Sequence, residues 1–218
     1  MTEFTGRDGT LVSDELPAWT FFRQWLKNPR AMASLSPSGR QLAREMVAQI
    51  PQRARRVVEL GAGTGVFTRA LLDHGIAPRD LLVVELNAEF HRLLERRFPG
   101  VGVVHGDARD LCGIAARTGF AHPGEVDAVV SGLGFLAMPR SVQQAILEAV
   151  FSVLGPGRPL IQFTYAPRNP LPQGLLDRLG LDVRRAGFAW RNMPPAMVYV
   201  YARRRARPSR RNGVGSIG

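Results

Sequence analysis

At 218 residues the chain has the length of one α/β domain with a modest N-terminal extension, which argues against a second independent core. Hydrophobic residues make up 45% and charged residues 22% of the chain, which excludes a disordered or fibrous protein. The formal net charge of +11 favours a polyanionic partner, either a nucleic acid or an anionic membrane. Lys27 is the only lysine among 29 basic residues, which indicates a coding bias and weakens any argument from arginine content alone.

The cysteine count and the hydropathy of the chain limit the cellular compartments in which it is expected. Cys112 is the single cysteine, so no intramolecular disulfide or multi-cysteine metal site can form, and a reducing compartment is expected. The first residues are polar and acidic, unlike a signal peptide, and no apolar stretch reaches the roughly 18 residues of a spanning helix. We therefore expect a cytoplasmic protein without a metal, whose membrane contact, if any, is peripheral on the inner face of the cytoplasmic membrane.

The first segment with a helical pattern covers residues 16–27. Trp19, Phe22 and Trp25 fall on one face of this predicted amphipathic helix, while Arg23 and Lys27 mark the other face. The sequence leaves two interpretations open. The helix lies in a bilayer interface, with its rings at headgroup level, or it packs over a binding cleft of the main domain.

Strands and helices then alternate along the chain. Strands are predicted at 56–60, 81–86, 101–105, 126–131 and 159–165, and helices at 38–50, 67–74, 88–98 and 142–154. Near-continuous apolar strands separated by helices indicate a parallel sheet covered on both faces, and segments 183–188 and 197–201 are expected to close it as an antiparallel pair. The predicted organisation is an extension at 1–34, one α/β domain at 35–202 and a basic, disordered tail at 203–218.

A glycine-rich loop follows the first predicted strand. Gly61, Gly63 and Gly65 alternate where this strand turns into a helix, which lets the backbone turn tightly and approach a ligand closely. The GxGxG spacing differs from the GxGxxG of dinucleotide sites. Glu59, just before the glycines, could accept a hydrogen bond from a cationic ligand amine. The loop alone is weak evidence, because turn chemistry explains many such matches.

The ends of the next strands carry further candidate ligands. Glu85 ends the second strand, where a carboxylate can accept both ribose hydroxyls of a nucleoside, and Asp107 follows the third, where it can accept the exocyclic amine of adenine. Ser131 ends the fourth strand, beside the place where a methyl donor and acceptor would meet. Each acid alone is more often a surface residue, but strand-end groups in register are harder to dismiss. The full predicted cofactor set is Glu59, Gly61, Gly63, Gly65, Glu85, Asn87, Asp107, Ala108, Ser131, Gly132 and Leu133.

Taken together, these residues resemble the class I S-adenosylmethionine (SAM) dependent methyltransferases over about residues 35–202. The resemblance implies a Rossmann-like fold with a mostly parallel seven-stranded sheet and an antiparallel C-terminal strand, with SAM as cofactor and S-adenosylhomocysteine as product. A narrower resemblance, to the bacterial phospholipid N-methyltransferases, rests on Ser36-Pro37-Ser38, VVELGAGTGVFT, VVELNAEF, Ser131-Gly132-Leu133, IQFTY and Arg191 to Ala196. It implies methylation of phosphatidylethanolamine toward phosphatidylcholine at the membrane surface, with an anionic bilayer as partner.

The alternative is a ribosomal RNA adenine dimethyltransferase, which shares the GxGxG loop. Those enzymes need a segment such as NLPY after the fourth strand to hold a flipped base. Here residues 131–135 read Ser-Gly-Leu-Gly-Phe, which is evidence against a nucleic-acid acceptor. A SAM-binding protein without activity is a third class, against which the intact motif set argues.

Three residues are candidates for the acceptor side. Tyr165, at the end of the fifth predicted strand, could face the acceptor through its hydroxyl or ring, or could simply pack a strand end. Arg191 and Asn192 could hold a substrate phosphate, or could cap a turn before Pro194.

Overall fold

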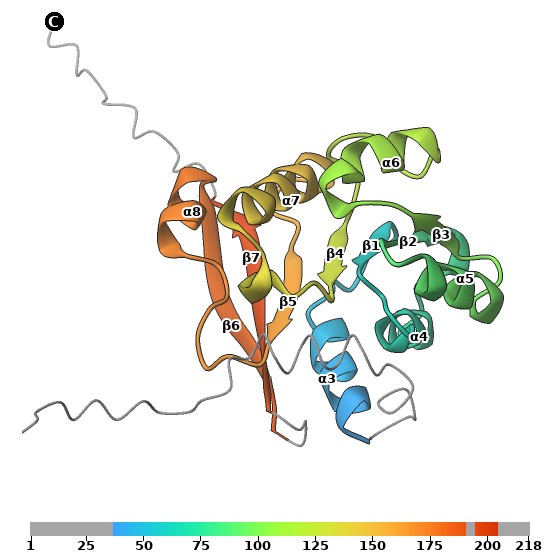
Figure 1. Cartoon of the computed structure of the whole chain (residues 1–218), viewed down its shortest axis with the longest axis horizontal. Helices are drawn as coiled ribbons and strands as arrows, with labels where there is room; N and C mark the ends of the chain where they lie inside the picture. The colour runs from blue at the N-terminus through green and yellow to red at the C-terminus, as the bar shows by residue number, and fades with distance from the viewer. Residues whose placement is uncertain (1–36, 191–194, 205–218) are drawn as a thin grey trace, which may run out of the picture.

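The computed structural model describes residues 37–190 and 195–204 (Figure 1). The predicted N-terminal helix with Trp19, Phe22 and Trp25 lies outside the described residues, as do Arg191, Asn192 and the tail from residue 205 on. Predictions for these segments stay predictions. Within the described ranges, no helix combines the length and the apolar character needed to cross a bilayer.

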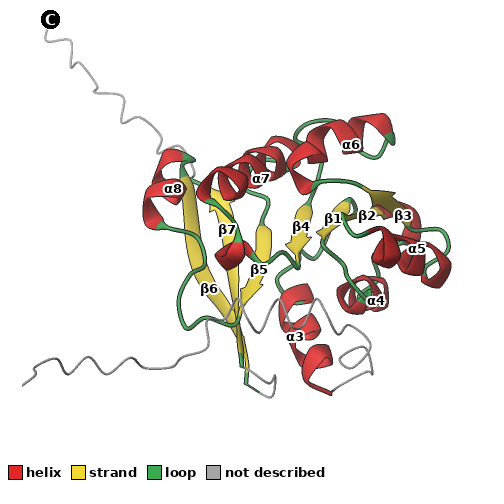
Figure 2. Ribbon diagram, viewed as in Figure 1, coloured by secondary structure: helices red, strands yellow, loops and turns green. Residues whose placement is uncertain are grey.

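Helices and strands alternate along the described chain, as Figure 2 shows. In order they are α3 (Pro37–Val47), β1 (Val57–Leu60), α4 (Val66–Asp73), β2 (Leu81–Glu85), α5 (Ala88–Arg97), β3 (Gly102–His105), α6 (Leu111–Arg117), β4 (Ala128–Ser131), α7 (Arg140–Val153), β5 (Leu160–Thr164), α8 (Gln173–Arg178), β6 (Leu181–Ala189) and β7 (Ala196–Arg203). Short 3-10 turns lie at η1 (Pro78–Asp80), η2 (Ala108–Asp110) and η3 (Phe135–Ala137).

The seven strands form one sheet in the order β3-β2-β1-β4-β5-β7-β6. Strands β1 to β5 are parallel, whereas β7 runs antiparallel to both β5 and β6, so the predicted fold class is confirmed. Leu60 pairs with Val84 and with Ser131, and Ser131 pairs with Gln162. The carboxyl ends of these strands therefore meet at one edge, called the carboxyl edge below, and the opposite edge is the amino edge.

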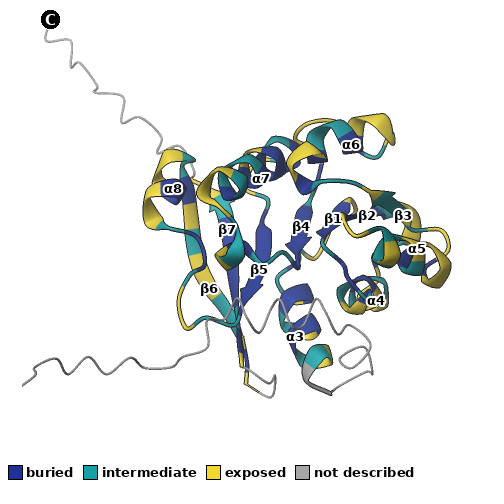
Figure 3. Cartoon of the chain, in the orientation of Figure 1, coloured by how far each residue is buried: buried dark blue, intermediate teal, exposed yellow. Residues whose placement is uncertain are grey.

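Helices cover both faces of the sheet (Figure 1). One hydrophobic cluster joins α3, α4 and α5 to one face, and the other joins α6, α7 and α8 to the opposite face. The strands β1, β2, β4 and β5 are buried along their whole length, whereas β3, the outermost strand on one side of the sheet, is partly exposed (Figure 3). This burial on both faces explains why the central strands read as continuous apolar runs instead of alternating ones.

Some element boundaries differ from the sequence prediction. The short helices α6 and α8, of 7 and 6 residues, were not predicted, because segments this short carry too few turns for a clear helical period. The fourth strand begins at Ala128 instead of Val126, which forms an isolated parallel bridge to Leu154. Strand β6 is longer than predicted and contains an irregularity between Arg185 and Gly187 that the alternation of residues does not reveal.

Candidate functional site

The glycine loop lies at the carboxyl edge between β1 and α4, in close contact with the segment after β4. The Gly61 N–H donates to the Val84 carbonyl (2.9 Å), and the Gly132 N–H donates to the Leu60 carbonyl (2.8 Å). A Cβ atom on Gly132 would lie 2.5 Å from the Gly61 oxygen, so the two backbones touch. A Cβ on Gly65, which has φ +83°, would meet the Phe98 ring at 2.4 Å. Both contacts require glycine for reasons of space.

Glu85 fastens this loop to the end of β2. Its side chain is buried, and Oε2 accepts the Gly63 N–H (2.9 Å) while Oε1 accepts the Asn87 N–H (2.9 Å). Each carboxylate oxygen can accept a further hydrogen bond. The same carboxylate could therefore hold the loop and accept two hydroxyl groups of a ligand.

Glu59 is a buried acid one residue before the end of β1. Its Oε2 accepts the Thr68 hydroxyl (2.7 Å) from α4, and its Oε1 is buried without a hydrogen-bond partner among the described residues. Burial raises the pKa of Glu59 to about 8, against the lowering effect of the Thr68 hydrogen bond and with a further increase from the charge of Glu85. An unpartnered acidic oxygen at this place would be satisfied by a cationic donor.

This raised pKa predicts how the stability of the unliganded protein depends on pH. The unfolded chain loses the Glu59 proton near pH 4.5, while the folded protein keeps it up to about pH 8. Between these values unfolding releases a proton, so the free energy of unfolding should fall as pH rises. Above about pH 8 this contribution should level off. Thermal melts of the wild type and Glu59→Gln across pH 5–9 check the prediction, because the variant should lack this component. Identical pH profiles would contradict it.

Asn87, Asp107 and Ala108 lie at the ends of β2 and β3. The Asn87 Oδ1 caps α5 by accepting the backbone N–H groups of Glu89 and Phe90, so this oxygen stabilises the N-terminus of the helix. Asp107 forms an ion pair with Arg109 (2.6 Å), whose hydrogen bond is the main cause that holds the Asp107 pKa below its usual range. Sequence reasoning missed this arginine. A ligand amine would therefore share the Asp107 carboxylate with Arg109. Ala108 is buried beside it at the start of η2.

Two buried glutamines hold the segment after β4, and sequence reasoning missed both. On β5, the Gln162 Nε2 donates to the Leu133 carbonyl (2.9 Å), and its Oε1 is buried without a partner among the described residues. On α7, the Gln143 Nε2 donates to the Phe135 carbonyl (2.7 Å). Ser131 is buried, and its Oγ accepts the Leu133 N–H at 3.3 Å. A polar residue in the apolar run of β5 was the available signal.

Tyr165 follows β5 and belongs to a row of aromatic rings. Its ring contacts Phe163 edge-on (5.4 Å between centroids), and Phe163 contacts Phe67 of α4 in the same manner (5.6 Å). Phe67 lies two residues after the glycine loop. The row therefore connects the end of β5 to the first turn of α4, which follows the glycine loop.

The structure thus brings the predicted cofactor residues together at the carboxyl edge. The loops after β1 and β4 touch through Gly61 and Gly132, and Glu85 at the end of β2 accepts the Gly63 N–H. Two buried carboxylates, Glu59 and Glu85, therefore lie beside these loops. In doubly wound α/β folds the ligand binds outside the carboxyl ends of the strands. The arrangement can hold a nucleoside that carries a cationic amine, with its reactive group near the end of β4.

Comparison with known proteins agrees with this geometry. A family model described as a methyltransferase domain matches residues 57–157. The chain is 37% identical over 183 residues to an ornithine lipid N-methyltransferase of Singulisphaera acidiphila, which covers 82% of this chain and 92% of that protein. It is also 43% identical over 68 residues to ribosomal RNA small subunit methyltransferase A of Methylococcus capsulatus, but this match covers 29% of this chain and 25% of that protein.

Solved structures share the fold at low sequence identity. A TehB-like SAM-dependent methyltransferase from Corynebacterium glutamicum has a TM-score of 0.58 at 18% identity, covering 86% of this chain and 98% of that one. The 1,6-didemethyltoxoflavin-N1-methyltransferase of Burkholderia thailandensis, with bound 1,6-didemethyltoxoflavin and S-adenosylhomocysteine, has a TM-score of 0.60 at 14% identity, covering 86% and 87%. The chain belongs to the class I SAM-dependent methyltransferases. Its cofactor is SAM, which the unpartnered Glu59 oxygen and the close-packed glycine loop fit.

Proposed function

We propose that this protein transfers a methyl group from SAM to the amine of a membrane lipid, with phosphatidylethanolamine as the first candidate acceptor. The observation that carries the proposal is the 37% identity to an ornithine lipid N-methyltransferase over 92% of that protein's length. The sequence motifs shared with phospholipid N-methyltransferases favour phosphatidylethanolamine, and the relative itself makes ornithine lipid the second candidate. Both carry an amine on a polar headgroup.

Each predicted cofactor residue would bind a different part of SAM. Glu59 would accept the amine of the methionine part, and Gly61, Gly63 and Gly65 would let it approach the backbone. Glu85 would accept the ribose hydroxyls beside Asn87. Asp107 and Ala108 would hold the adenine, and Ser131, Gly132 and Leu133 would border the transferred methyl group. These roles are supported by the positions of the residues at the carboxyl edge.

Methyl transfer from SAM does not need a general acid to expel the leaving group. Methyl transfer from a sulfonium is an in-line displacement with a leaving group that departs neutral, so alignment of the acceptor nitrogen supplies much of the rate. The amine must first lose its proton, to water or to a nearby acceptor. Tyr165 is our candidate for a residue that faces the acceptor, because it follows β5 and its row of rings reaches Phe67 in the first turn of α4.

The acceptor would place the enzyme at the inner surface of the cytoplasmic membrane, on an anionic bilayer. Trp19, Phe22 and Trp25 would insert, while Arg191 and Asn192 would bind the lipid phosphate. The high net charge of +11 supports an anionic surface. No nucleic-acid acceptor is expected.

Incubation of the full chain with labelled SAM should place the label on lipid. The acceptors are vesicles that contain phosphatidylethanolamine, vesicles that contain ornithine lipid, and ribosomal RNA, each tested separately. We expect label in phosphatidylethanolamine and none above background in RNA. The Glu85→Ala variant is the matched control for cofactor-dependent transfer. Label in ornithine lipid alone would move the assignment to the second candidate, and label in RNA alone would overturn the lipid function.

A further inference from the structure

The large hydrophobic side chains that the described ranges expose to solvent gather at the carboxyl edge of the sheet. Val66, 39% exposed, begins α4 directly after the glycine loop. Leu86, 66% exposed, directly follows β2, and Leu136, 45% exposed, lies in η3 after β4. Each of these residues therefore adjoins a loop of the candidate site.

The end of β6 adds two aromatic residues to the same edge. Phe188 is 49% exposed and Trp190 is 61% exposed. Phe188 pairs with Met197, which also pairs with Thr164, the last residue of β5. Phe188 thus lies level with the carboxyl end of β5, and Trp190 follows two residues beyond it. Four separate segments present apolar side chains around the site.

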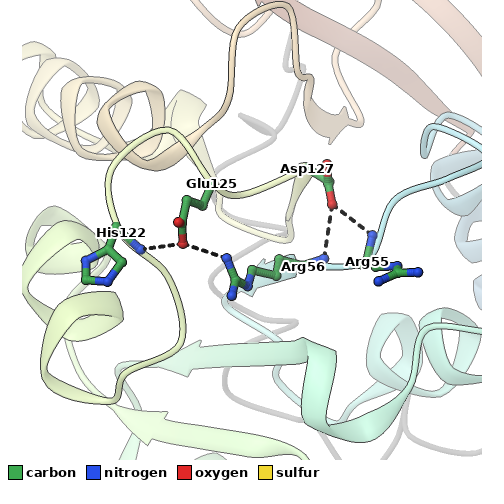
Figure 4. Close-up of polar contacts among 5 residues, drawn as sticks. All are labelled: Arg55, Arg56, His122, Glu125 and Asp127. Atoms are coloured by element: carbon green, nitrogen blue, oxygen red, sulfur yellow. Dashed lines mark hydrogen bonds and ion pairs between the residues drawn. The ribbon is translucent and has the colours of Figure 1, made fainter.

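The amino edge has the opposite character. Figure 4 shows Arg56 bound to Glu125 (2.5 Å) and the backbone N–H groups of Arg55 and Arg56 bound to Asp127 (2.9 and 3.2 Å). The His122 N–H donates to the Glu125 carboxylate as well (3.0 Å). The acids before β4 therefore bind Arg56 and the backbone before β1, while the exposed Arg53 and Arg55 side chains form no ion pair within the described ranges.

Ion pairs also lie at the far end of the amino edge. Arg204, after β7, forms ion pairs with Asp177 (2.6 Å) and Asp182 (3.0 Å). Nearer the centre of the sheet, Arg158 before β5 pairs with Asp127 (2.9 Å). Single exposed apolar side chains are ordinary on any protein surface. Their concentration on one edge distinguishes it from the amino edge, which carries none of the exposed large hydrophobic side chains of the described ranges.

We propose that this protein docks on an anionic bilayer with its carboxyl edge, through the exposed side chains of Val66, Leu86, Leu136, Phe188 and Trp190. The inference rests on the proposed lipid acceptor. A lipid that keeps its acyl chains in the bilayer offers its amine at headgroup level, so the loop after β4 must reach the membrane surface. Leu136 lies in that loop, and tryptophan is well suited to the headgroup region.

Charge on this edge is compatible with an anionic surface. Arg40 on α3 is exposed and follows Gly39, whose Cβ position lies 3.9 Å from the Val66 side chain. Arg140, exposed at the start of α7, lies four residues after Leu136. Neither arginine forms an ion pair within the described ranges. The exposed Glu89 at the start of α5 offsets one of these charges.

The test replaces the two aromatic residues that lie farthest from the cofactor loops. Phe188→Ser with Trp190→Ser should lower binding of the full chain to phosphatidylglycerol vesicles by at least about tenfold, because two large apolar side chains no longer insert. The matched control, Phe188→Leu with Trp190→Leu, keeps apolar surface and should bind nearly as the wild type does. Vesicle flotation measures binding, while calorimetry with SAM and a thermal melt show that both variants remain folded.

The N-terminal segment could bind vesicles independently and hide the effect. The same pairs are therefore compared in a full chain that carries Trp19→Ala and Trp25→Ala. If adding Phe188→Ser and Trp190→Ser (the serine pair) to the Trp19→Ala, Trp25→Ala protein also leaves its flotation unchanged, the docking proposal is overturned. If the serine pair lowers the thermal midpoint or dissociates a dimer, with vesicle binding unchanged, the edge is covered by residues 1–36 or by a second copy instead.

The proposal can fail separately from the lipid function. Methylation of phosphatidylethanolamine dispersed in detergent micelles does not require docking on a bilayer. Transfer to micellar lipid, together with vesicle binding that is unchanged in Phe188→Ser with Trp190→Ser, would retain the function and reject the docking face. Loss of vesicle binding in the serine pair, without transfer to any lipid by the wild type, would retain the face and reject the function.

Discussion

Replacing Glu85 by alanine should weaken SAM binding by at least about 100-fold. The buried carboxylate is placed to accept two ribose hydroxyls, and hydrogen bonds to a charged group contribute about 1.5–3 kcal/mol each. Two bonds at the lower limit correspond to about 3 kcal/mol, and every 1.4 kcal/mol changes Kd about tenfold. The variant also loses the acceptors of the Gly63 and Asn87 N–H groups, so the glycine loop keeps the Gly61 bond to Val84 but loses its hydrogen bond to β2 at Gly63.

Calorimetry with SAM and a thermal melt separate these two effects. Glu89→Ala is the matched control, because Glu89 lies on the same segment with an exposed side chain. It should leave Kd nearly unchanged and cost at most about 1 kcal/mol through its position at the start of α5. A Glu85→Ala protein that melts cooperatively and binds SAM with the wild-type Kd would remove Glu85 from the site.

Much of the fold was predictable because its signals are local. The buried strands β1, β2, β4 and β5 are short runs rich in β-branched and aliphatic residues, and glycine or proline bounds most of them. A parallel sheet buried on both faces produces this pattern directly. The helices α6 and α8 were missed because neither is long enough to show a repeating apolar face. Their position depends on packing against α7 and β6.

The candidate site was predictable to the extent that it follows from strand ends. Residues such as Glu59, Glu85 and Ser131 lie near one another because the parallel register aligns the carboxyl ends of their strands. Their partners were not predictable in this way. Thr68 reaches Glu59 from a neighbouring helix, and Gln162 reaches the Leu133 carbonyl from a neighbouring strand. Such contacts depend on how the layers pack, which periodicity does not encode.

The polarity of the two sheet edges was also hidden in the sequence. Leu86, Leu136 and Phe188 each look like ordinary members of apolar segments, and the chain separates them widely. The sheet order brings the ends of β2, β4 and β6 to one side of the domain. Only then does their exposure form a pattern, while the arginines and acids that precede the strands pair at the other side.

Gly132→Ala should disturb the site through the backbone, without removing any polar group. The added Cβ would lie 2.5 Å from the Gly61 oxygen and 3.5 Å from the Leu60 oxygen. Neither atom can move freely, because the Gly61 N–H is bound to the Val84 carbonyl inside the sheet. The glycine loop or the segment after β4 must therefore shift. Overpacking of this kind costs about 1–3 kcal/mol, which corresponds to a fall in the thermal midpoint of about 2–10 °C.

The same shift should weaken SAM binding, because the cofactor residues lie on the two segments that are forced apart. Gly174→Ala is the matched control. Gly174 lies in α8, has no positive φ, and its Cβ position meets only the Arg178 side chain at 3.8 Å. Alanine there should be neutral or stabilise the helix by about 0.5–1 kcal/mol. Thermal melts and SAM calorimetry on both variants check the prediction. If Gly132→Ala melts and binds SAM like Gly174→Ala, the two loops do not touch as closely as the structure shows.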